Sequence, residues 1–228
     1  MHSIKEEVLS ANKWIVEKGL VELTWGNVSY CDRDQELIYI KPSGVKLSSS
    51  CADDISCVNF ENNVISGLRP SVDTPTHIEI YKSFKEATCV VHTHSRYATI
   101  FAQADMAVPC LGTTHADYFY GTIPCIPCPT YPEVQGDYEK STGTAIASFY
   151  NNNKIDYNSI QACLISGHAP FVWGRSIESA LENAYVLEIV CEYAYKTMSL
   201  NPESYLSRYV IDKHFLRKHG AKKYYGQR

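Results

Sequence analysis

The hydrophobic period of the chain switches repeatedly between that of helices and that of strands, and this alternation restricts the fold more than any other feature. Residues 3–18 carry apolar side chains at helical spacing, begin with a capping box of Ser3 and Glu6, and stop before Gly19. The next stretches, LVELTWGNVSY and ELIYIKPSG, have the composition of strands joined by a polar turn. Such alternation favours a sheet covered by helices.

The rest of the sequence continues in the same way. ISCVNF and VISG, separated by ENN, are typical of a hairpin, and ATCVVHTH is expected to be a buried strand. Thr74 as N-cap with Pro75 after it predicts a helix that ends near Phe84. The other expected elements are helices over 96–105 and 137–152, two strands within 161–174, a long helix capped by Ser176 and ending near Leu200, and a last helix from about Pro202 to His219 with Gly220 at its C′ position.

Length and composition limit the classes of protein that the chain can belong to. At 228 residues it predicts a single domain, 1–228, that buries about 70% of its unfolded surface. No apolar run approaches the ~18 residues of a membrane span, and a net charge of −4 argues against nucleic-acid binding, so neither role is expected. The N-terminus lacks the apolar core of a signal peptide, and nine cysteines without a framework spacing fit a reducing compartment, which predicts a cytoplasmic protein.

Histidines in two distant segments form a candidate metal site. His92 and His94 in VVHTHS would project from the same side of a strand, and His168 in ISGHAPF follows a later strand. Three imidazoles leave the fourth position of a zinc ion open, as in catalytic sites. Asp73 precedes a helix N-terminus, where it can approach the metal. The alternatives are solvated or core-packed histidines and an aspartate that only caps the helix.

Two small-residue loops are candidates for binding an anion. Gly26 and Asn27 in TWGNVS, and Ser43 and Gly44 in KPSGV, can bring backbone N–H groups and polar side chains close to a ligand. Lys41 adds a cation beside the second loop. Neither loop matches a nucleotide-binding fingerprint, and an ordinary turn is the commoner meaning of each.

Two further residues carry acid–base chemistry if their surroundings shift their pKa. Asp117 stands among aromatic residues in HADYFYG, where burial would raise the pKa of its carboxyl. Tyr225 follows Lys222 and Lys223, and nearby cations lower the pKa of a phenol. From the residues alone, local bonding is the commoner role for such an aspartate and a structural role is the stronger interpretation of Tyr225.

In this order, the motifs TWGNVS, IKPSGV, PSVDTPTH, VHTHSRYAT, GTTHADYFYG and DKHFLRKHGAKKYYGQ resemble those of the L-ribulose-5-phosphate 4-epimerases, a branch of the class II aldolase/adducin-head family. The resemblance spans almost the whole chain. HTHS with a later SGHAPF is common to the superfamily, whereas DTPTH, THADYFYG and the YYGQ ending are more specific to the epimerase branch.

The resemblance implies a fold and a set of site residues. The expected fold is a single-domain three-layer α/β/α sandwich with a mixed, largely antiparallel sheet, assembled as a homotetramer with active sites between subunits. One departure is that Val72 stands where relatives usually have serine. The implied residues are His92, His94 and His168 for Zn²⁺ with Asp73 next to it; Asp117 and Tyr225 as the catalytic acid–base pair that reaches a neighbouring subunit's site; Gly26, Asn27, Ser43, Gly44, Ser71 and the position of Val72 for substrate phosphate or hydroxyls; and Thr113 and Glu139 behind them.

The implied activity interconverts L-ribulose 5-phosphate and D-xylulose 5-phosphate in pentose catabolism. C4 of a ketopentose phosphate is not alpha to the carbonyl and carries no acidic proton, so simple proton removal does not invert it. Cleavage and re-formation of the C3–C4 bond with zinc as Lewis acid is the available route. The alternatives are a class II sugar-phosphate aldolase of the L-fuculose-phosphate aldolase type, which has a glutamate where this chain has Asp73, and a non-catalytic module like the adducin head.

Overall fold

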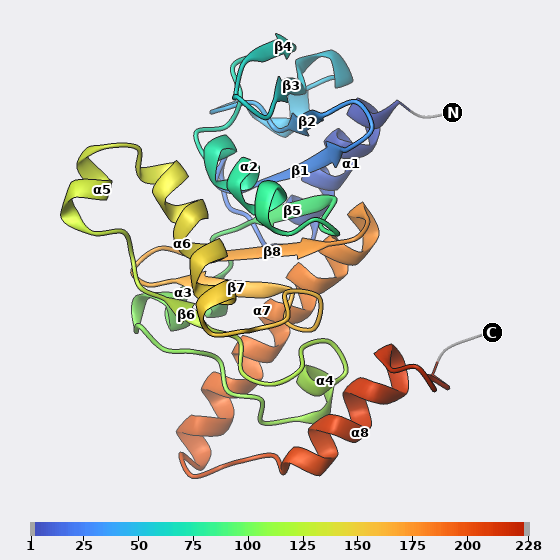
Figure 1. Ribbon diagram of the computed structural model, residues 1–228, viewed down its shortest axis with the longest axis vertical. Coiled ribbons are helices and arrows are strands. Elements are labelled where there is room, and N and C mark those ends of the chain that lie inside the picture. Colours follow the sequence, from blue (N-terminus) through green and yellow to red (C-terminus); the bar gives the residue numbers. More distant parts are fainter. Residues whose placement is uncertain (1–2, 226–228) are drawn as a thin grey trace.

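The computed structural model describes residues 3–225 and shows one eight-stranded sheet with helices on both faces (Figure 1). The strand order is β4-β3-β2-β1-β5-β8-β7-β6. The pair β6–β7 is parallel and the other pairs are antiparallel, so the sheet is mixed and largely antiparallel, as expected. The strands are β1 (Asn27–Asp32), β2 (Leu37–Ile40), β3 (Ser56–Asn59), β4 (Val64–Ser66), β5 (Cys89–His92), β6 (Cys125–Ile126), β7 (Ala162–Ile165) and β8 (Pro170–Gly174).

Two hydrophobic clusters show that the molecule has three layers. Cys89 and Val91 of β5 face one cluster, which includes residues of α1, α3 and α7, and Val90 faces the other, which includes residues of α2 and α6. In Figure 1, α2 and α6 lie in front of the sheet and α7 behind it. Every residue of β5, β7 and β8 is buried, and burial on both faces explains why these strands are apolar apart from His92. The expected α/β/α sandwich is confirmed.

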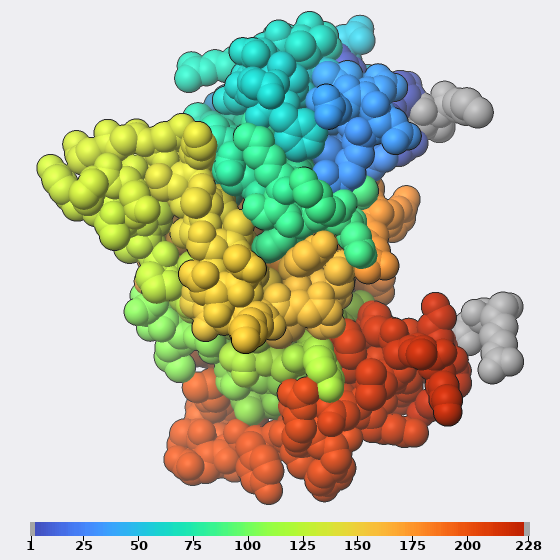
Figure 2. Space-filling view, viewed as in Figure 1, coloured from blue at the N-terminus to red at the C-terminus, as the bar shows by residue number. Residues whose placement is uncertain are grey.

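Helix boundaries follow the capping signals of the sequence closely at most positions. The helices are α1 (Ile4–Glu17), α2 (Thr74–Ser83), α3 (Arg96–Gln103), α4 (Thr113–Ala116), α5 (Tyr131–Gln135), α6 (Tyr138–Asn152), α7 (Ile177–Leu200) and α8 (Arg208–His219), with short 3₁₀ turns at Leu47–Ser49 and Ala52–Asp54. Ser3 and Ser176 are N-caps whose side chains accept from the backbone N–H groups of Glu6 and Ser179. Helices α4 and α8 pack together at the lower end of the molecule in Figures 1 and 2.

Several expected boundaries were wrong. Residues 20–26 form an irregular loop and the strand begins only at Asn27, because the chain turns sharply at Gly26. The last helix begins after Ser207 rather than near Pro202, and Gly220 has a φ of −74°, so it does not form a left-handed cap. Strand β5 ends at His92, which leaves His94 in the loop beyond it. Among the described residues, no helix is long and apolar enough to cross a membrane.

Candidate metal centre

Three histidines from separate segments converge at the end of the central strands. Strand β8 pairs with β5 so that Phe171 lies opposite His92, and this register places the β7–β8 turn, with His168, beside the end of β5. His94 follows in the loop after β5. One ring nitrogen from each of the three lies within 4.8 Å of the others, and the ring centroids are 5.0 to 5.1 Å apart. These distances suit three ligands of one ion.

The surroundings of the imidazoles fit a bound metal ion. The Nδ1–H of His92 donates to the carbonyl of Pro170 at 2.9 Å, which leaves Nε2 free as a ligand, and the ring stacks on Phe171. Nδ1 of His168 is buried and has no hydrogen-bond partner among the described residues. Burial, followed by the neighbouring His92, lowers the pKa of His94 and of His168 to about 4. Both rings are therefore neutral at pH 7, as metal ligands must be.

Asp73 lies beside the three histidines as an ionised carboxylate. It occupies the N-cap position of α2, one residue earlier than expected, but its side chain makes no capping hydrogen bond, so the simple capping role is wrong. Instead it accepts from Nδ2 of Asn27 at 2.7 Å and from Oγ of Ser71 at 3.3 Å. Burial alone would raise the pKa of Asp73, but nearby histidines, His92 first, outweigh burial and hold the pKa below its usual value.

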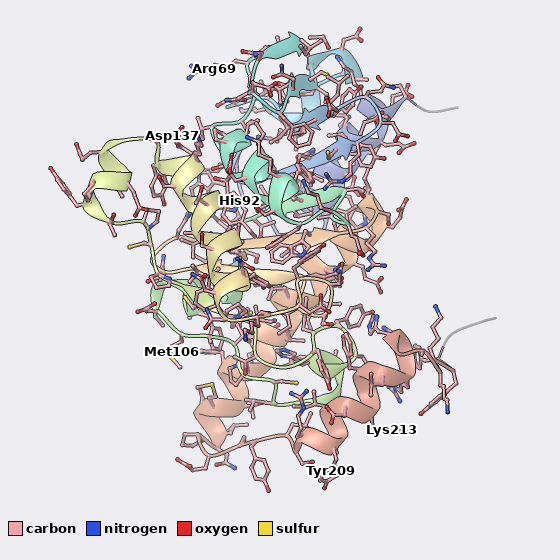
Figure 3. All side chains as sticks on the ribbon, viewed as in Figure 1. Arg69, His92, Met106, Asp137, Tyr209 and Lys213 are labelled. Atoms are coloured by element: carbon pink, nitrogen blue, oxygen red, sulfur yellow. The ribbon has the colours of Figure 1, made fainter. Side chains whose placement is uncertain are left out.

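The three histidines line a cavity of about 470 Å³. It lies between the loop before β1, the loop after β2 and the beginnings of α2 and α6. Figure 3 labels His92 and, near the start of α6, its N-cap Asp137, which directly precedes the lining residues Tyr138 and Glu139. Apart from Thr113 and the expected catalytic pair, Asp117 and Tyr225, the site residues expected from the sequence all line this cavity. They are Gly26, Asn27, Ser43, Gly44, Ser71, Val72, Asp73, His92, His94, Glu139 and His168.

Sequence reasoning missed three lining residues: Thr24, Trp25 and Tyr138. Trp25 lies with its ring 6.3 Å from that of His94, and Tyr138 lies at the same centroid distance from His168. Their positions directly before Gly26 and directly before Glu139 were the available signal. Each of the two aromatic rings therefore borders one of the histidines.

Lys41 is the basic residue among those that line the cavity. Its side chain is buried and its Nζ donates to the backbone carbonyl of Thr24 at 3.0 Å. Burial lowers the pKa of Lys41, an effect that the charge of Asp73 partly opposes. A cation in this position can complement an anionic group of a ligand.

The expected catalytic pair lies outside this cavity, at the end of the molecule formed by α4 and α8. Arg217 donates to both carboxylate oxygens of Asp117, at 2.8 and 3.1 Å, and His214 contacts the same carboxylate at 3.2 Å. In place of the expected aromatic shelter, the Asp117 carboxylate has the guanidinium of Arg217 and the imidazole of His214 as partners. The ring of Tyr225 packs against the cations of Arg217 and Lys218 rather than those of its sequence neighbours.

Within one chain, therefore, the structure brings together the three histidines and the binding residues but not Thr113, Asp117 and Tyr225. Thr113 is the first residue of α4, the helix that ends before Asp117. Arg217 contacts both members of the expected catalytic pair, so they form a second group of polar residues. That this group reaches the metal site of a neighbouring subunit stays a prediction.

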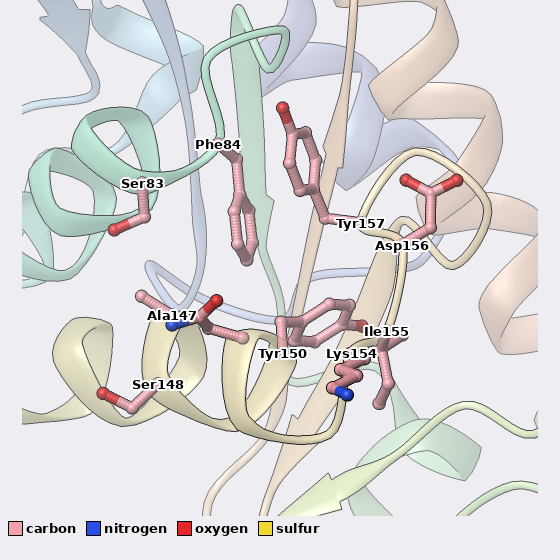
Figure 4. A pocket seen from close by; sticks show the side chains of 10 residues that line it. Ser83, Phe84, Ala147, Ser148, Tyr150, Lys154, Ile155, Asp156 and Tyr157 are labelled. Carbon is pink, nitrogen blue, oxygen red and sulfur yellow. The ribbon is translucent and has the colours of Figure 1, made fainter.

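A larger cavity, of about 650 Å³, lies at the opposite ends of α2 and α6 (Figure 4). Phe84 and Tyr157 stack in its wall with ring centroids 4.5 Å apart, and Tyr150 packs edge-on against Phe84. The phenol of Tyr150 donates to the carbonyl of Ala162. The described residues that line it include no histidine, so the metal-ligand set belongs to the smaller cavity.

Comparisons with known proteins agree with this architecture. The family model described as Class II Aldolase and Adducin N-terminal domain matches residues 6–195. An L-fuculose 1-phosphate aldolase structure superposes with a TM-score of 0.79 at 21% identity, covering 94% of this chain and 96% of that one. YgbL from Klebsiella pneumoniae gives 0.73 at 23% identity, covering 92% and 96%. L-fuculose-1-phosphate aldolase from Thermus thermophilus gives 0.66 at 22% identity, covering 89% and 98%.

Proposed function

The chain belongs to the class II aldolase and adducin N-terminal domain family, and from this premise we propose that it is a zinc-dependent L-ribulose-5-phosphate 4-epimerase that works as a homotetramer. The observation that carries the proposal is the convergence of His92, His94 and His168 in a polar cavity. A short carboxylate, Asp73, stands beside them. This donor set fits Zn²⁺ with an open position for substrate.

The residues have distinct roles in the proposed reaction. The three histidines would hold the ion, which when bound supplies Lewis-acid charge near the C2 and C3 oxygens of the sugar. Asn27 and Ser71 hold the Asp73 carboxylate in a fixed orientation beside the histidines. The loops with Gly26, Ser43 and Gly44, together with Lys41, would anchor the substrate phosphate.

Two acid–base groups complete the reaction. One member of the pair Asp117 and Tyr225 takes the proton of the C4 hydroxyl while the C3–C4 bonding electrons pass into a three-carbon enediolate and C4 becomes an aldehyde. The aldehyde turns, the enediolate carbon adds to its other face, and the second member returns a proton to the C4 oxygen. The pair would come from the neighbouring subunit, because in its own chain it lies outside the cavity.

Val72 affects only the phosphate end of this scheme. Its side chain lines the cavity and is half exposed, but it has no hydroxyl with which to donate to phosphate. Any contact at this position would come from the backbone N–H, and loss of one neutral hydrogen bond corresponds to about 0.5–1.5 kcal/mol.

A coupled assay tests the proposal. The purified protein is incubated with L-ribulose 5-phosphate, and formation of D-xylulose 5-phosphate is followed before and after removal of metal by a chelator and after return of Zn²⁺. We expect turnover that the chelator abolishes and zinc restores. Absence of xylulose 5-phosphate from the zinc-loaded protein would contradict the proposal.

The second candidate is a class II sugar-phosphate aldolase, which the structural likeness to L-fuculose 1-phosphate aldolases supports. The two activities share the metal site and the bond cleavage. They differ in the fate of the aldehyde, which an aldolase releases. Accumulation of free aldehyde in place of xylulose 5-phosphate in the same assay would favour the aldolase.

A further inference from the structure

The loop before β1 carries Trp25 on a turn that is fixed at its outer end. The backbone N–H of Trp25 donates to the carbonyl of Glu22 at 3.1 Å and closes the turn. The carboxylate of Glu22 accepts two hydrogen bonds from Arg96 of α3, at 2.6 and 3.1 Å. Leu23, inside the turn, has a φ of +55°, an unusual backbone conformation for a leucine. The backbone hydrogen bond and the Glu22–Arg96 contacts therefore hold the turn in one conformation.

The inner end of the loop is fixed against the metal site itself. The buried Nζ of Lys41 donates to the carbonyl of Thr24. Gly26 has a φ of +78°, and a Cβ at this position would lie 2.7 Å from the carbonyl oxygen of His92. These contacts on both sides hold the backbone of the residue between them, Trp25, beside the metal site.

The indole of Trp25 lines the cavity that also holds the histidines and the candidate phosphate loops. Its ring centroid lies 6.3 Å from that of His94, and the next two residues, Gly26 and Asn27, line the same cavity. The side chain is nevertheless 52% exposed. An exposed aromatic side chain that lines the cavity on a constrained backbone is suited to contact a ligand there.

We propose that Trp25 retains the two-carbon aldehyde between bond cleavage and bond re-formation, so that the protein epimerises rather than releases its products. This inference rests on the proposed function. The fragment that must turn is glycolaldehyde phosphate, and its phosphate end belongs with the loops next to Trp25. The indole packs against the C–H groups of the fragment and keeps water from it while its carbonyl turns.

Release of the aldehyde is the alternative to its re-addition. The aldehyde leaves as glycolaldehyde phosphate, and the three-carbon enediolate takes up at carbon the proton that the acid–base group received from the C4 hydroxyl, which yields dihydroxyacetone. Apart from re-addition to the original face, which returns L-ribulose 5-phosphate, each sugar phosphate that is cleaved gives either one xylulose 5-phosphate or one pair of free fragments. The ratio of these two outcomes measures retention directly.

The test compares Trp25→Ala, Trp25→Phe and the wild type, with Trp14→Phe as matched control. Trp14 lies on α1, packs against Tyr185 and does not line the cavity. Each zinc-loaded protein receives L-ribulose 5-phosphate, and free aldehyde and xylulose 5-phosphate are quantified together. We expect the ratio of free aldehyde to xylulose 5-phosphate to rise by about tenfold or more in Trp25→Ala, since one lost apolar contact changes discrimination by roughly 10–200-fold. In Trp25→Phe and Trp14→Phe this ratio should stay near that of the wild type.

A readout independent of turnover accompanies the test. Trp173 is fully buried and Trp14 lies outside the cavity, so glycolaldehyde phosphate should change the fluorescence of the wild type and of Trp14→Phe but not that of Trp25→Phe. Zinc content and sedimentation are measured for every variant. A wild type that forms no xylulose 5-phosphate refutes the proposed function. A wild type that epimerises, with an unchanged ratio in Trp25→Ala, refutes only the role of Trp25, as does a raised ratio that accompanies loss of the oligomeric state.

Discussion

The three imidazoles of the metal centre are oriented by different parts of the chain. His92 is held at the end of a buried strand by the carbonyl of Pro170 and by stacking on Phe171. His94 and His168 sit on a loop and a turn, where burial rather than a hydrogen bond is the main cause of their low pKa. Because His94 lies in the loop after β5 rather than in the buried strand, its replacement should disturb the fold less than that of His92.

We therefore expect His94→Asn to lose most of its zinc and at least ~10²-fold of the activity, because a ligand of a three-histidine site is gone. Metal analysis after dialysis and the coupled assay measure the two effects. His219→Gln, which changes an imidazole outside the cavity, serves as control and should keep its zinc. Full zinc occupancy in His94→Asn would exclude His94 from the ligand set.

Arg217 links the two residues of the expected catalytic pair. It forms two hydrogen bonds to Asp117, whose side chain is 15% exposed, and its cation lies 5.0 Å from the ring centroid of Tyr225. We expect Arg217→Met to lower kcat by about tenfold or more with zinc content unchanged, because Asp117 loses the contacts that orient it. Arg208→Met removes a comparable ion pair and ring contact on the same helix, to Asp212 and Tyr120, and should leave kcat near the wild type. Equal effects of Arg217→Met and Arg208→Met on kcat would indicate that Arg217 has a purely structural role.

At the scale of elements, the position of the metal centre depends on how closely the loop before β1 approaches β5. Asn27 pairs with His92 in the β1–β5 ladder, and the residue before it is a glycine in a left-handed conformation. A second close approach joins the front helices, where Thr76 of α2 donates to the carbonyl of Glu139 of α6 at 2.6 Å. These contacts place the binding loops and the start of α6 around the histidines.

Gly26→Ala should therefore be far more damaging than the same change at an unconfined glycine. The new Cβ would meet the carbonyl oxygen of His92 at 2.7 Å, so strain and overpacking together should lower the free energy of unfolding by about 2–4 kcal/mol. Gly19 also has a positive φ but has open space around it, and Gly19→Ala should lower the free energy of unfolding by only about 1–2 kcal/mol. Urea unfolding of both variants, with metal analysis, measures the difference. Equal stabilities of the two variants would show that the close contact between residue 26 and the carbonyl of His92 does not exclude a side chain.

For the whole molecule, the separation of the histidines from Asp117 and Tyr225 predicts that each active site combines two subunits. Mixing inactive His94→Asn and Asp117→Asn proteins and reassembling them should restore activity, because some sites then receive intact histidines from one subunit and an intact Asp117 from the next. Random mixing in a cyclic tetramer should restore about one quarter of the wild-type activity. The unmixed variants treated in the same way are the controls. No recovery in verified mixed oligomers would mean that each site is built from one chain.

The buried histidines also predict how the stability of the metal-free protein depends on pH. Burial lowers the pKa of His115 to about 4 and that of His77 to about 3, although nearby Asp73 opposes the latter shift. Below about pH 6.5 the unfolded chain binds protons at these imidazoles and the folded protein does not, so stability falls between about pH 6.5 and pH 4. Urea unfolding in chelator measures this loss, which should be smaller in His115→Gln. Stability that stays constant or rises on acidification would contradict the prediction.

The sequence by itself determined the elements and the residue types of the metal site. Hydrophobic period and capping residues are local properties, so helices such as α1 and α7 and the mixed α/β architecture followed from them. Likewise, two nearby histidines with a third in a later turn suffice to indicate a ligand set. The same local signals erred at Gly26 and before Ser207, where loop geometry rather than period sets the boundary.

Only the tertiary structure decided which distant residues meet. The pairing of β5 with β8 brings His168 to His92, and the packing of α8 on α4 gives Asp117 a guanidinium partner in place of an aromatic shelter. The tertiary structure also placed Trp25 beside His94 and Tyr138 beside His168. The physical reason is that local spacing sets the direction of a side chain from its own backbone, whereas strand register and helix packing set the distance between segments far apart in the chain.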